Sequence, residues 1–271
     1  MSAVRLNVAG HFLLPHNLFK FANRKGYVMR EREVVLFDAY GTVIDVGTYH
    51  RDITEYVLDE CSSKRGRNID PEEFNSSWNR EFERAFSDIN EYCGEFRNVR
   101  ELYGISTKRV LSKYGIALTY NKVEELNTVY KKMLDEAVAV TPSVKKTLEV
   151  LRSEGYDMGL VSNGDTEELL EHMNGVKEYF DVVITSEDLN IYKPDPRIFA
   201  EAVRRVGVRK EQAAFIGDTL TSDVLGAKKA GIKSVWYNRR KRLPEHGIKA
   251  DFEIRDMAEV VQILNSQIFK H

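Results

Sequence analysis

The stretch VVLFDAYGTVID, residues 34–45, is the part of the sequence that decides the fold class. Four apolar residues lead into Asp38, and a Gly-Thr pair follows at Gly41 and Thr42. A short apolar run that stops at turn residues is typical of a strand buried on both faces, so we predict a strand that ends at Asp38. A buried strand that delivers a carboxylate to a turn indicates chemistry. Tyr40 stands where a second carboxylate would have identified the reaction.

The composition is that of an ordinary globular protein. The chain has 271 residues, 42% hydrophobic and 30% charged, with a formal net charge of −2. This length allows one large domain or two modest ones. The net charge provides no field that would attract nucleic acid, and no apolar stretch approaches the roughly 18 residues of a membrane span. The basic run Arg239–Arg242 is a local exception that we interpret as a solvated loop.

Cysteine and histidine usage argues against disulfides and zinc. Cys61 and Cys93 are not a close pair, and the six histidines form no zinc motif, which suits a reducing, cytoplasmic compartment. Residues 1–30 differ from the rest because they contain five basic residues and no acidic one. Such a segment is compatible with organelle targeting or a membrane-surface anchor. We favour a simple N-terminal extension ahead of a domain that begins near residue 31.

Helices are predicted in the segment that follows the first strand. Between residues 48 and 138 apolar residues recur at three- and four-residue spacing, which predicts helices and no strand. These helices are expected at about 50–61, around 74–89, at 98–114 and at 121–137.

After Thr141-Pro142, short apolar strands alternate with amphipathic helices. With the first strand at 33–38, further strands are expected at 157–162, 182–185, 213–216, 234–237 and 252–254. Helices are expected at 143–153, 166–173, 196–206, 221–230 and 256–268. This alternation predicts an α/β fold in which a doubly wound parallel sheet has helices on both faces. We expect residues 31–47 and 139–271 to form this core, with an all-helical cap domain inserted at 48–138.

Polar residues follow four of the predicted strands. They are Asp38 to Thr42, Ser162-Asn163-Gly164, Lys193-Pro194, and Gly217-Asp218 to Asp223. Because the carboxyl ends of parallel strands meet at one edge of a sheet, these groups are expected in one crevice. Each has an ordinary explanation by itself, as a helix cap or a turn. Four such strand ends together are much harder to attribute to accident.

The expected cluster favours phosphoryl chemistry. Clustered carboxylates repel one another unless a cation neutralises them, and oxygen ligands from two or three aspartates suit Mg²⁺. Such a cation beside Lys193 is a receptor for a phosphoryl group, whose remaining oxygens Ser and Thr hydroxyls can hold. Asp38 is then either a plain metal ligand or a covalent nucleophile.

In order and spacing, the four motifs resemble those of the haloacid dehalogenase-like hydrolase superfamily. The resemblance covers about 33–47 and 140–255. It implies a Rossmann-like core with a helical cap inserted after the first motif, a position that residues 48–138 fit. It also implies that Asp38 forms an aspartyl intermediate and that Lys193 balances the charge of the transferring group.

The same resemblance assigns the other site residues. It implies that Thr42 and Ser162 bind the transferring group. Asp218 would hold Mg²⁺ together with Asp38 and the backbone carbonyl of Tyr40, and Asp223 would support that site directly or through water. The neighbouring motif residues Asn163, Gly164 and Tyr40 are expected to contact the substrate.

The first and fourth motifs favour different reactions. Asp-Ala-Tyr-Gly-Thr looks like the first motif of 2-haloacid dehalogenases, whereas the superfamily's phosphatases usually have an acid-donating Asp in place of Tyr40. Asp218 and Asp223 look like the phosphatase form, whereas the dehalogenases use no metal. We weight the metal evidence more heavily and expect a Mg²⁺-dependent phosphatase that acts on a small phosphorylated metabolite through an aspartyl-phosphate on Asp38. A metal-independent 2-haloacid dehalogenase and a non-catalytic protein that binds phosphorylated ligands are the alternatives.

The remaining expectations concern the missing acid and the cap. The enzyme either prefers leaving groups that need little protonation, such as acyl or aryl phosphates, or borrows an acid from Asp45 or the cap. In the cap, Arg80, Arg84 and Arg97 are either substrate grips or exposed helix charges. Its aromatic residues either line a pocket or form the core of the cap; they are Phe82, Phe86, Tyr92, Phe96 and Tyr103. Both a monomer and a homodimer are compatible with the sequence.

Overall fold

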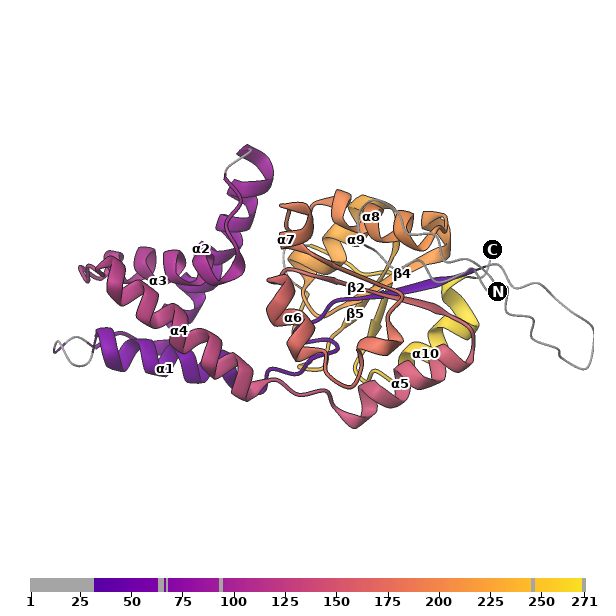
Figure 1. Ribbon diagram of the computed structural model, residues 1–271, viewed down its shortest axis with the longest axis horizontal. Helices are drawn as coiled ribbons and strands as arrows, with labels where there is room; N and C mark the ends of the chain where they lie inside the picture. Colours follow the sequence, from indigo (N-terminus) through magenta and orange to yellow (C-terminus); the bar gives the residue numbers. More distant parts are fainter. Residues whose placement is uncertain (1–31, 63–65, 67, 93–94, 245–246, 270–271) are drawn as a thin grey trace, which may run out of the picture. The chain divides into compact units, whose positions relative to one another are not determined.

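A six-stranded parallel sheet forms the centre of the protein in a computed structural model, which describes residues 32–62, 66, 68–92, 95–244 and 247–269 (Figure 1). The strand order is β3-β2-β1-β4-β5-β6. The strands are β1 (Val34–Phe37), β2 (Asp157–Ser162), β3 (Val182–Thr185), β4 (Ala213–Gly217), β5 (Lys233–Tyr237) and β6 (Phe252–Ile254). The predicted α/β fold is confirmed, and all six strands lie where they were expected. The predicted extension at 1–30 lies outside the described residues.

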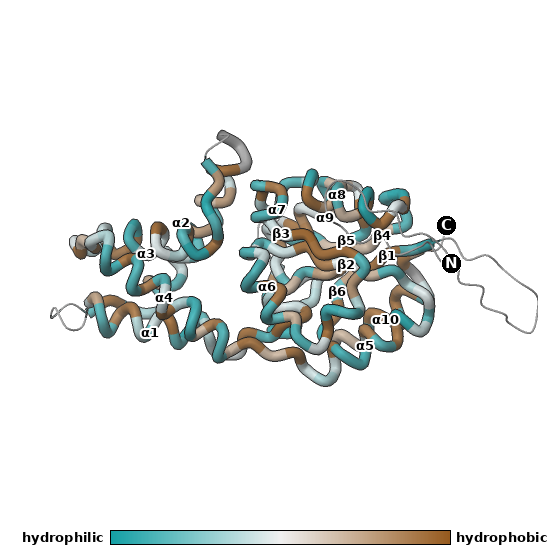
Figure 2. Tube along the Cα trace, viewed as in Figure 1, coloured by the Kyte–Doolittle hydropathy of each residue, from teal (hydrophilic) through white to brown (hydrophobic). Residues whose placement is uncertain are grey.

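Strand β1 lies in the middle of the sheet and is buried on both faces. It pairs in parallel with β2 on one side and β4 on the other. Val35 and Phe37 enter one hydrophobic cluster and Val34 and Leu36 enter another, because successive side chains point to opposite faces. All four residues are fully buried. This explains why the run is apolar without alternation, and Figure 2 shows the same hydrophobic character along the central strands.

Helices cover the two faces of the sheet. One face is covered by α5 (Pro142–Ser153), α6 (Thr166–His172) and α10 (Glu259–Ile263), and the other by α8 (Pro196–Val206) and α9 (Leu225–Ala230) (Figure 1). A π-helical turn precedes α9 at Leu220–Val224, and another follows α10 at Leu264–Ile268. The short helix α7 (Ser186–Leu189) follows β3. In the part of the chain that the structure describes, no helix combines the length and the apolar composition needed to cross a membrane.

Four further helices lie in the sequence between β1 and β2. They are α1 (Tyr49–Cys61), α2 (Pro71–Tyr92), α3 (Val99–Lys113) and α4 (Tyr120–Ala137). We call this segment the helical block. It has a hydrophobic cluster largely of its own, in which the ring of Trp78 stacks on Phe82 and Tyr103 at centroid distances of 4.7 and 5.0 Å. The predicted helices are therefore confirmed, whereas the domain boundaries proposed at residues 48 and 138 stay predictions.

The first turn of α3 donates hydrogen bonds to a residue outside the helical block. The carboxylate of Asp165, in the loop after β2, accepts from the backbone N–H groups of Val99 and Arg100 at 2.8 and 3.4 Å. Asn98 caps the next free amide, that of Glu101, at 2.9 Å. Backbone N–H groups at a helix start have no partner within the helix, so Asp165 and Asn98 together satisfy all three.

A second contact joins the helical block to the chain just before Lys193. Tyr192 is fully buried, and its ring stacks between Phe86 and Phe96 at centroid distances of 4.3 and 5.4 Å. Its hydroxyl donates to the backbone oxygen of Arg97 at 2.7 Å. Phe86 and Phe96 therefore pack on a residue outside the helical block, whereas the two alternatives from the sequence were a pocket lining and the core of the cap.

Candidate active site

Asp38 lies at the edge of the sheet where the carboxyl ends of β1, β2 and β4 are side by side. Its Oδ1 lies 2.6 Å from the Nζ of Lys193, and its Oδ2 accepts a hydrogen bond of 3.1 Å from the Oγ1 of Thr42. Asp38 and Thr42 are 7% and 3% exposed. The structure thus brings together three of the predicted site residues, although Lys193 is 155 positions from Asp38 in the sequence.

The ammonium group of Lys193 is buried and fully hydrogen-bonded. Its three hydrogens are matched by three acceptors, namely Asp38 Oδ1 at 2.6 Å, Asp223 Oδ1 at 2.7 Å and the backbone oxygen of Val161 at 3.0 Å. Asn163 holds the backbone of Lys193, since its Oδ1 accepts from the Lys193 N–H and its Nδ2 donates to the Lys193 oxygen. Asn163 therefore positions Lys193, and its contact with substrate stays a prediction.

Ser162 ends β2 with a buried side chain that lacks a protein partner. It is 1% exposed, and among the described residues its Oγ has no hydrogen bond. A buried hydroxyl without a partner is uncommon and costs about 1–3 kcal/mol, so this oxygen is a free polar group on the strand next to β1. The following Gly164 is engaged, because its N–H donates to the Oγ of Ser186 at 3.1 Å. The predicted contact of Gly164 with substrate stays untested.

Two further carboxylates approach Asp38 from the end of β4. One oxygen each of Asp38, Asp218 and Asp223 lies within 4.8 Å of the others. Gly41 makes room for Asp218: its φ is +91°, and a Cβ there would lie 3.0 Å from the Asp218 carboxylate. A residue with a side chain would be strained at this φ and would crowd the carboxylate, which explains the glycine.

Asp223 is the more deeply buried of the two, at 1% exposed. Its Oδ1 accepts from Lys193 and its Oδ2 from the backbone N–H of Thr219 at 3.0 Å. A Cβ at Gly217 would lie only 2.5 Å from Asp223, so glycine at the end of β4 allows the carboxylate to fold back against the strand. Because both oxygens already accept hydrogen bonds, this geometry suits a supporting role better than direct ligation.

The charges of the cluster do not balance within it. Three carboxylates and one ammonium leave a formal charge of −2. Burial raises the pKa of Asp38 to about 7; Lys193 opposes this rise, and Asp223 and Asp218 add to it. Burial, followed by Asp223, also raises the pKa of Asp218. A divalent cation with hard oxygen ligands would remove this excess, so the three carboxylates fit Mg²⁺. The expected ligation by the backbone carbonyl of Tyr40 stays a prediction.

The side chain of Tyr40 is engaged with a histidine. Its hydroxyl lies 2.9 Å from the Nδ1 of His172 on α6, and the Nε2 of His172 lies 2.9 Å from Asp135 on α4. Burial raises the pKa of Tyr40 above its usual range, so the phenol stays protonated. Tyr40 thus joins the loop after β1 to α6 and α4, and its predicted contact with substrate stays a prediction.

Asp45 does not suit the role of a borrowed acid. Both of its oxygens lie 2.8 Å from the guanidinium of Arg239, a bidentate pair. The hydrogen bond from Arg239 lowers the pKa of Asp45 to about 2. At neutral pH this carboxyl carries no proton to donate, so the suggestion that Asp45 replaces the missing acid is wrong on this geometry.

The interpretation of Arg239–Arg242 as a plain solvated loop is also wrong in part. These residues are exposed, but Arg239 binds Asp45 and Arg242 binds Asp218. The sequence did contain a signal for this. The run follows β5, which pairs with β4, so the rule that gathered the other strand ends would have placed it beside Asp218.

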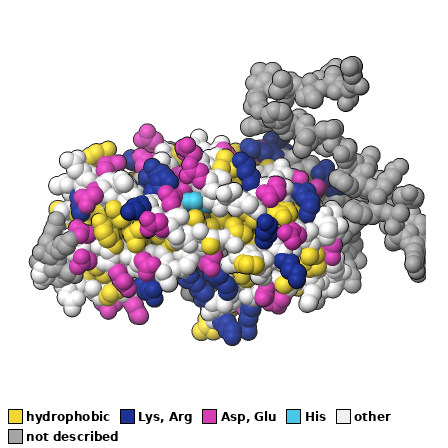
Figure 3. Space-filling view, turned by 60° about the horizontal axis from the view of Figure 1, so that its bottom comes forward, with side chains coloured by type: hydrophobic (Ala, Val, Ile, Leu, Met, Phe, Trp, Pro, Cys, Tyr) yellow, Lys and Arg dark blue, Asp and Glu magenta, His cyan; other side chains and the backbone are white. Residues whose placement is uncertain are grey.

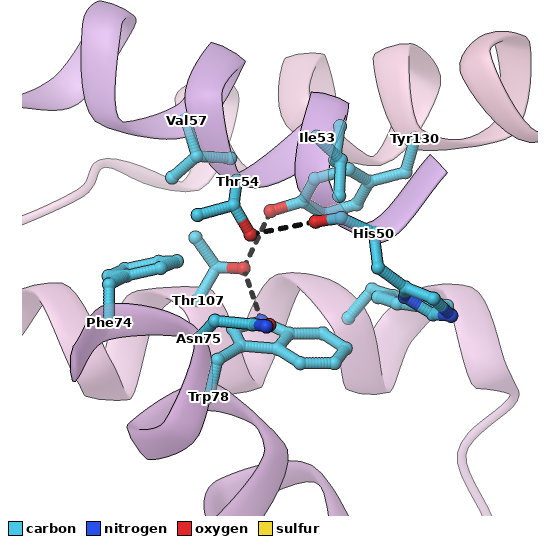
Figure 4. Close-up of a pocket in the computed structure, with 10 residues that line it drawn as sticks. His50, Ile53, Thr54, Val57, Phe74, Asn75, Trp78, Thr107 and Tyr130 are labelled. Carbon is cyan, nitrogen blue, oxygen red and sulfur yellow. Dashed lines mark hydrogen bonds between the residues drawn. The ribbon is translucent and has the colours of Figure 1, made fainter. Parts of the chain in front are cut away.

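The helical block contains a small cavity of its own (Figure 4). Its free space of about 20 Å³ is enough for roughly one water molecule. On its wall the indole N–H of Trp78 donates to the Oγ1 of Thr107 at 2.9 Å, and that oxygen lies 2.6 Å from the hydroxyl of Tyr130. The ten residues that line it include no carboxylate and no lysine or arginine; they are His50, Ile53, Thr54, Val57, Phe74, Asn75, Trp78, Tyr103, Thr107 and Tyr130. This composition indicates packing rather than catalysis.

The remaining aromatic and arginine residues named for the cap lie in different surroundings. Phe82 and Tyr103 stack with Trp78 in the interior of the helical block. Arg80 donates to the Oγ of Ser77 at 2.9 Å. The side chain of Tyr92 lies outside the described residues. Substrate binding by Arg80, Arg84 and Arg97 stays a prediction.

Charges of both signs are interspersed on the outer surface. Figure 3 shows lysine and arginine side chains next to aspartate and glutamate over the face in view. This mixture agrees with the formal net charge of −2.

The sheet order, the inserted helices and the grouping of carboxylates around a buried lysine define a class of α/β hydrolases with an acidic site at the sheet edge. Within this class the chain belongs to the haloacid dehalogenase-like hydrolase family, which matches residues 33–231.

Phosphatases and dehalogenases both occur among the similar proteins. Glyceraldehyde 3-phosphate phosphatase of Methanothermobacter thermautotrophicus is 34% identical over 131 residues, which span 45% of this chain and 58% of that relative. (S)-2-haloacid dehalogenase 4A of Burkholderia cepacia is 26% identical over 87% of this chain and 96% of its own. The crystal structure of a HAD phosphatase from Thermococcus onnurineus is 31% identical, with a TM-score of 0.58 over 87% of this chain and 99% of that one.

Proposed function

We propose that the protein is a Mg²⁺-dependent phosphatase that hydrolyses a small phosphorylated metabolite through an aspartyl-phosphate on Asp38. The observation that carries this proposal is the grouping of three carboxylates, those of Asp38, Asp218 and Asp223, around the one buried ammonium of Lys193. The formal charge inside this cluster is −2, and it is still −1 when Arg242 at the rim is counted. A dehalogenase that works without metal gains nothing from a second and third carboxylate, which would only raise the pKa of its nucleophile. Similarity to phosphatases at 31–34% identity supports the same reaction.

Each residue of the cluster has a role in this reaction. A carboxylate oxygen of Asp38 attacks phosphorus, and the bond from phosphorus to the leaving oxygen breaks. Lys193 stays protonated beside Asp38: burial alone would lower its pKa, but Asp223 and Asp38 raise it above the usual range. Thr42 and the unpaired hydroxyl of Ser162 hold phosphoryl oxygens. Bound at the carboxylates, Mg²⁺ would neutralise them and polarise the phosphoryl group.

Water completes the cycle. It attacks the phosphorus of the aspartyl-phosphate, the bond to Asp38 breaks, and inorganic phosphate leaves with the carboxylate restored. The leaving oxygen of the first step takes its proton from solvent. The hydroxyl of Tyr40 is hydrogen-bonded to His172, and Asp45 is ionised. We therefore assign the donation of that proton to neither residue. We therefore expect acyl and aryl phosphates to react faster than alkyl phosphates, since their leaving groups need little protonation.

The first experiment compares two substrates with and without metal. We expect release of phosphate from p-nitrophenyl phosphate in Mg²⁺ and its loss in EDTA. Chloride release from 2-chloropropionate is assayed in parallel. Halide release that survives EDTA, with no phosphate release, would overturn the proposal.

The second candidate function, a 2-haloacid dehalogenase, is favoured by two observations. Tyr40 completes the sequence Asp-Ala-Tyr-Gly-Thr, and the chain is similar to a named dehalogenase over almost its whole length. Turnover of neither substrate, with ligand binding unchanged in Asp38→Asn, would favour a non-catalytic binding protein instead.

A further inference from the structure

The loop after β5 brings an arginine to the mouth of the candidate site. β5 pairs with β4, so Asp218 and this loop follow neighbouring strands. The Nη2 of Arg242 donates to the backbone oxygen of Asp218 and lies 3.2 Å from its Oδ2. The two side chains are 43% and 27% exposed, which places this pair at the solvent side of a cluster whose other members are buried.

The loop holds Arg242 firmly in this position. Asn238 is 2% exposed, and its Oδ1 accepts from the N–H of Arg242 at 2.7 Å while its Nδ2 donates to the oxygen of Arg242 at 2.9 Å. The same amide nitrogen also donates to Glu253. At the start of the loop, Arg239 is tied to Asp45 by two hydrogen bonds. Both ends of the run Arg239–Arg242 are therefore fixed on the rim of the site.

Arg242 and a metal ion need the same carboxylate. Asp218 belongs to the oxygen cluster that fits Mg²⁺, and it is also the only acidic group to which Arg242 is paired among the described residues. Opposite charges at this distance attract strongly outside bulk water, and a cation on Asp218 opposes that attraction. With the metal bound, the guanidinium of Arg242 is left without its full counter-charge next to the reacting centre. A planar guanidinium in that state suits a carboxylate or a phosphate, which accept two parallel N–H bonds.

We propose that Arg242 sets the substrate specificity of this site by binding a second anionic group, a carboxylate or phosphate, on the phosphomonoester. Before substrate binds, Arg242 competes with Mg²⁺ for Asp218. The first of these statements rests on the proposed phosphatase function, whereas the second concerns metal binding alone.

Kinetics with matched aryl phosphates test the specificity. Phenyl phosphate has one anionic group, 3-carboxyphenyl phosphate adds a carboxylate, and 1,3-phenylene bisphosphate adds a phosphate. At a Mg²⁺ concentration that saturates both proteins, we expect Arg242→Gln to raise KM for the substrates with a second anion about ten- to hundredfold relative to KM for phenyl phosphate. Whichever of the two doubly anionic substrates shows the larger rise in KM carries the anion that Arg242 prefers.

Arg240→Gln is the matched control. Arg240 lies in the same loop and carries the same charge, but no hydrogen bond or ion pair of its side chain occurs among the described residues. We expect its three KM values to stay near those of the wild type. Equal losses in both variants, or equal losses for all three substrates in Arg242→Gln, would overturn the assignment to Arg242.

Metal binding is measured without substrate. The indole of Trp236 donates to the backbone oxygen of Asp218 at 3.0 Å, so its fluorescence, together with calorimetry, reports Mg²⁺ binding. We expect Arg242→Gln to bind Mg²⁺ about three- to tenfold more tightly, because a competing cation is removed. Unchanged or weaker binding would overturn the competition. If the wild type hydrolyses none of the three phosphates, the proposed function fails, while this titration still decides whether Arg242 and Mg²⁺ compete.

Discussion

The sheet edge and the interior of the helical block both bury polar side chains, but they compensate them differently. In the helical block, the hydroxyl of Thr107 is hydrogen-bonded to both Trp78 and Tyr130, and none of the three carries a formal charge. At the sheet edge, Asp38 and Lys193 form a buried ion pair inside a cluster that keeps excess negative charge. A neutral network that satisfies itself adds stability and needs no ligand. A buried cluster with unbalanced charge is costly until a ligand completes it, so the difference supports the proposal that the sheet edge is the binding region.

The largest expected effect is on turnover, and it comes from replacing Asp38 in the sheet-edge cluster. Asp38→Asn keeps the size of the side chain but removes the carboxylate that we propose as the nucleophile. Turnover of p-nitrophenyl phosphate should fall at least about 10³-fold. Steady-state kinetics measure this, with circular dichroism as the control for folding. Retention of more than a tenth of the activity would contradict the role of Asp38.

The pH dependence of stability should differ between wild type and Asp38→Asn in metal-free buffer. The pKa of Asp38 is about 7 in the folded protein against 3.8 ordinarily, so between these values the folded state holds a proton that the unfolded chain releases. This contribution is present below about pH 4 and is lost as the pH rises through 7. The free energy of unfolding of the wild type, relative to Asp38→Asn, should fall by on the order of 4 kcal/mol over that range. Urea denaturation measures it, and parallel curves for the two proteins would argue against the raised pKa.

Addition of Mg²⁺ should stabilise the sheet-edge cluster. A ligand that binds only the folded state at a hundred times its Kd stabilises it by about 2.7 kcal/mol. We expect the melting temperature of the wild type to rise with Mg²⁺ and return with EDTA. Asp218→Asn should lose most of this response, whereas Thr107→Val in the helical block should keep it.

The smallest effect is expected from breaking the neutral network. Thr107→Val removes the oxygen that Trp78 and Tyr130 share, and should lower the free energy of unfolding by about 1–2 kcal/mol. Water in the adjacent cavity can replace part of what is lost. KM and the response to Mg²⁺ should not change. A large loss of activity in this variant would show that the helical block does more than support the fold.

The elements that follow local patterns could be predicted from the sequence. The apolar run before Asp38 and the alternation after residue 141 determine the strands and helices, and the edge rule for parallel sheets gathers Asp38, Ser162, Lys193 and Asp218. These predictions needed only periodicity and topology, which extend over many residues.

Single long-range contacts could not be predicted in this way. Asp45 and Arg239 are 194 positions apart, and Tyr40 and His172 are 132 apart. Each is an ordinary residue type in an ordinary loop or helix, so no local pattern marks it. The role of Asp45 as a proton donor could not be judged from the sequence for that reason, because its proton affinity depends on Arg239 rather than on its own neighbours in the sequence.

The hydrogen bonds accepted by Asp165 limit how the helical block can be transferred into a related protein. The carboxylate of Asp165 closes the first turn of α3 from the loop after β2, 66 positions away, so one end of that helix depends on residues of the core. A chimera that takes the helical block alone would begin α3 with two unsatisfied amides and lose roughly 1 kcal/mol of helix stability. Transplants of this block into a related scaffold therefore need an aspartate grafted at the matching place in the host.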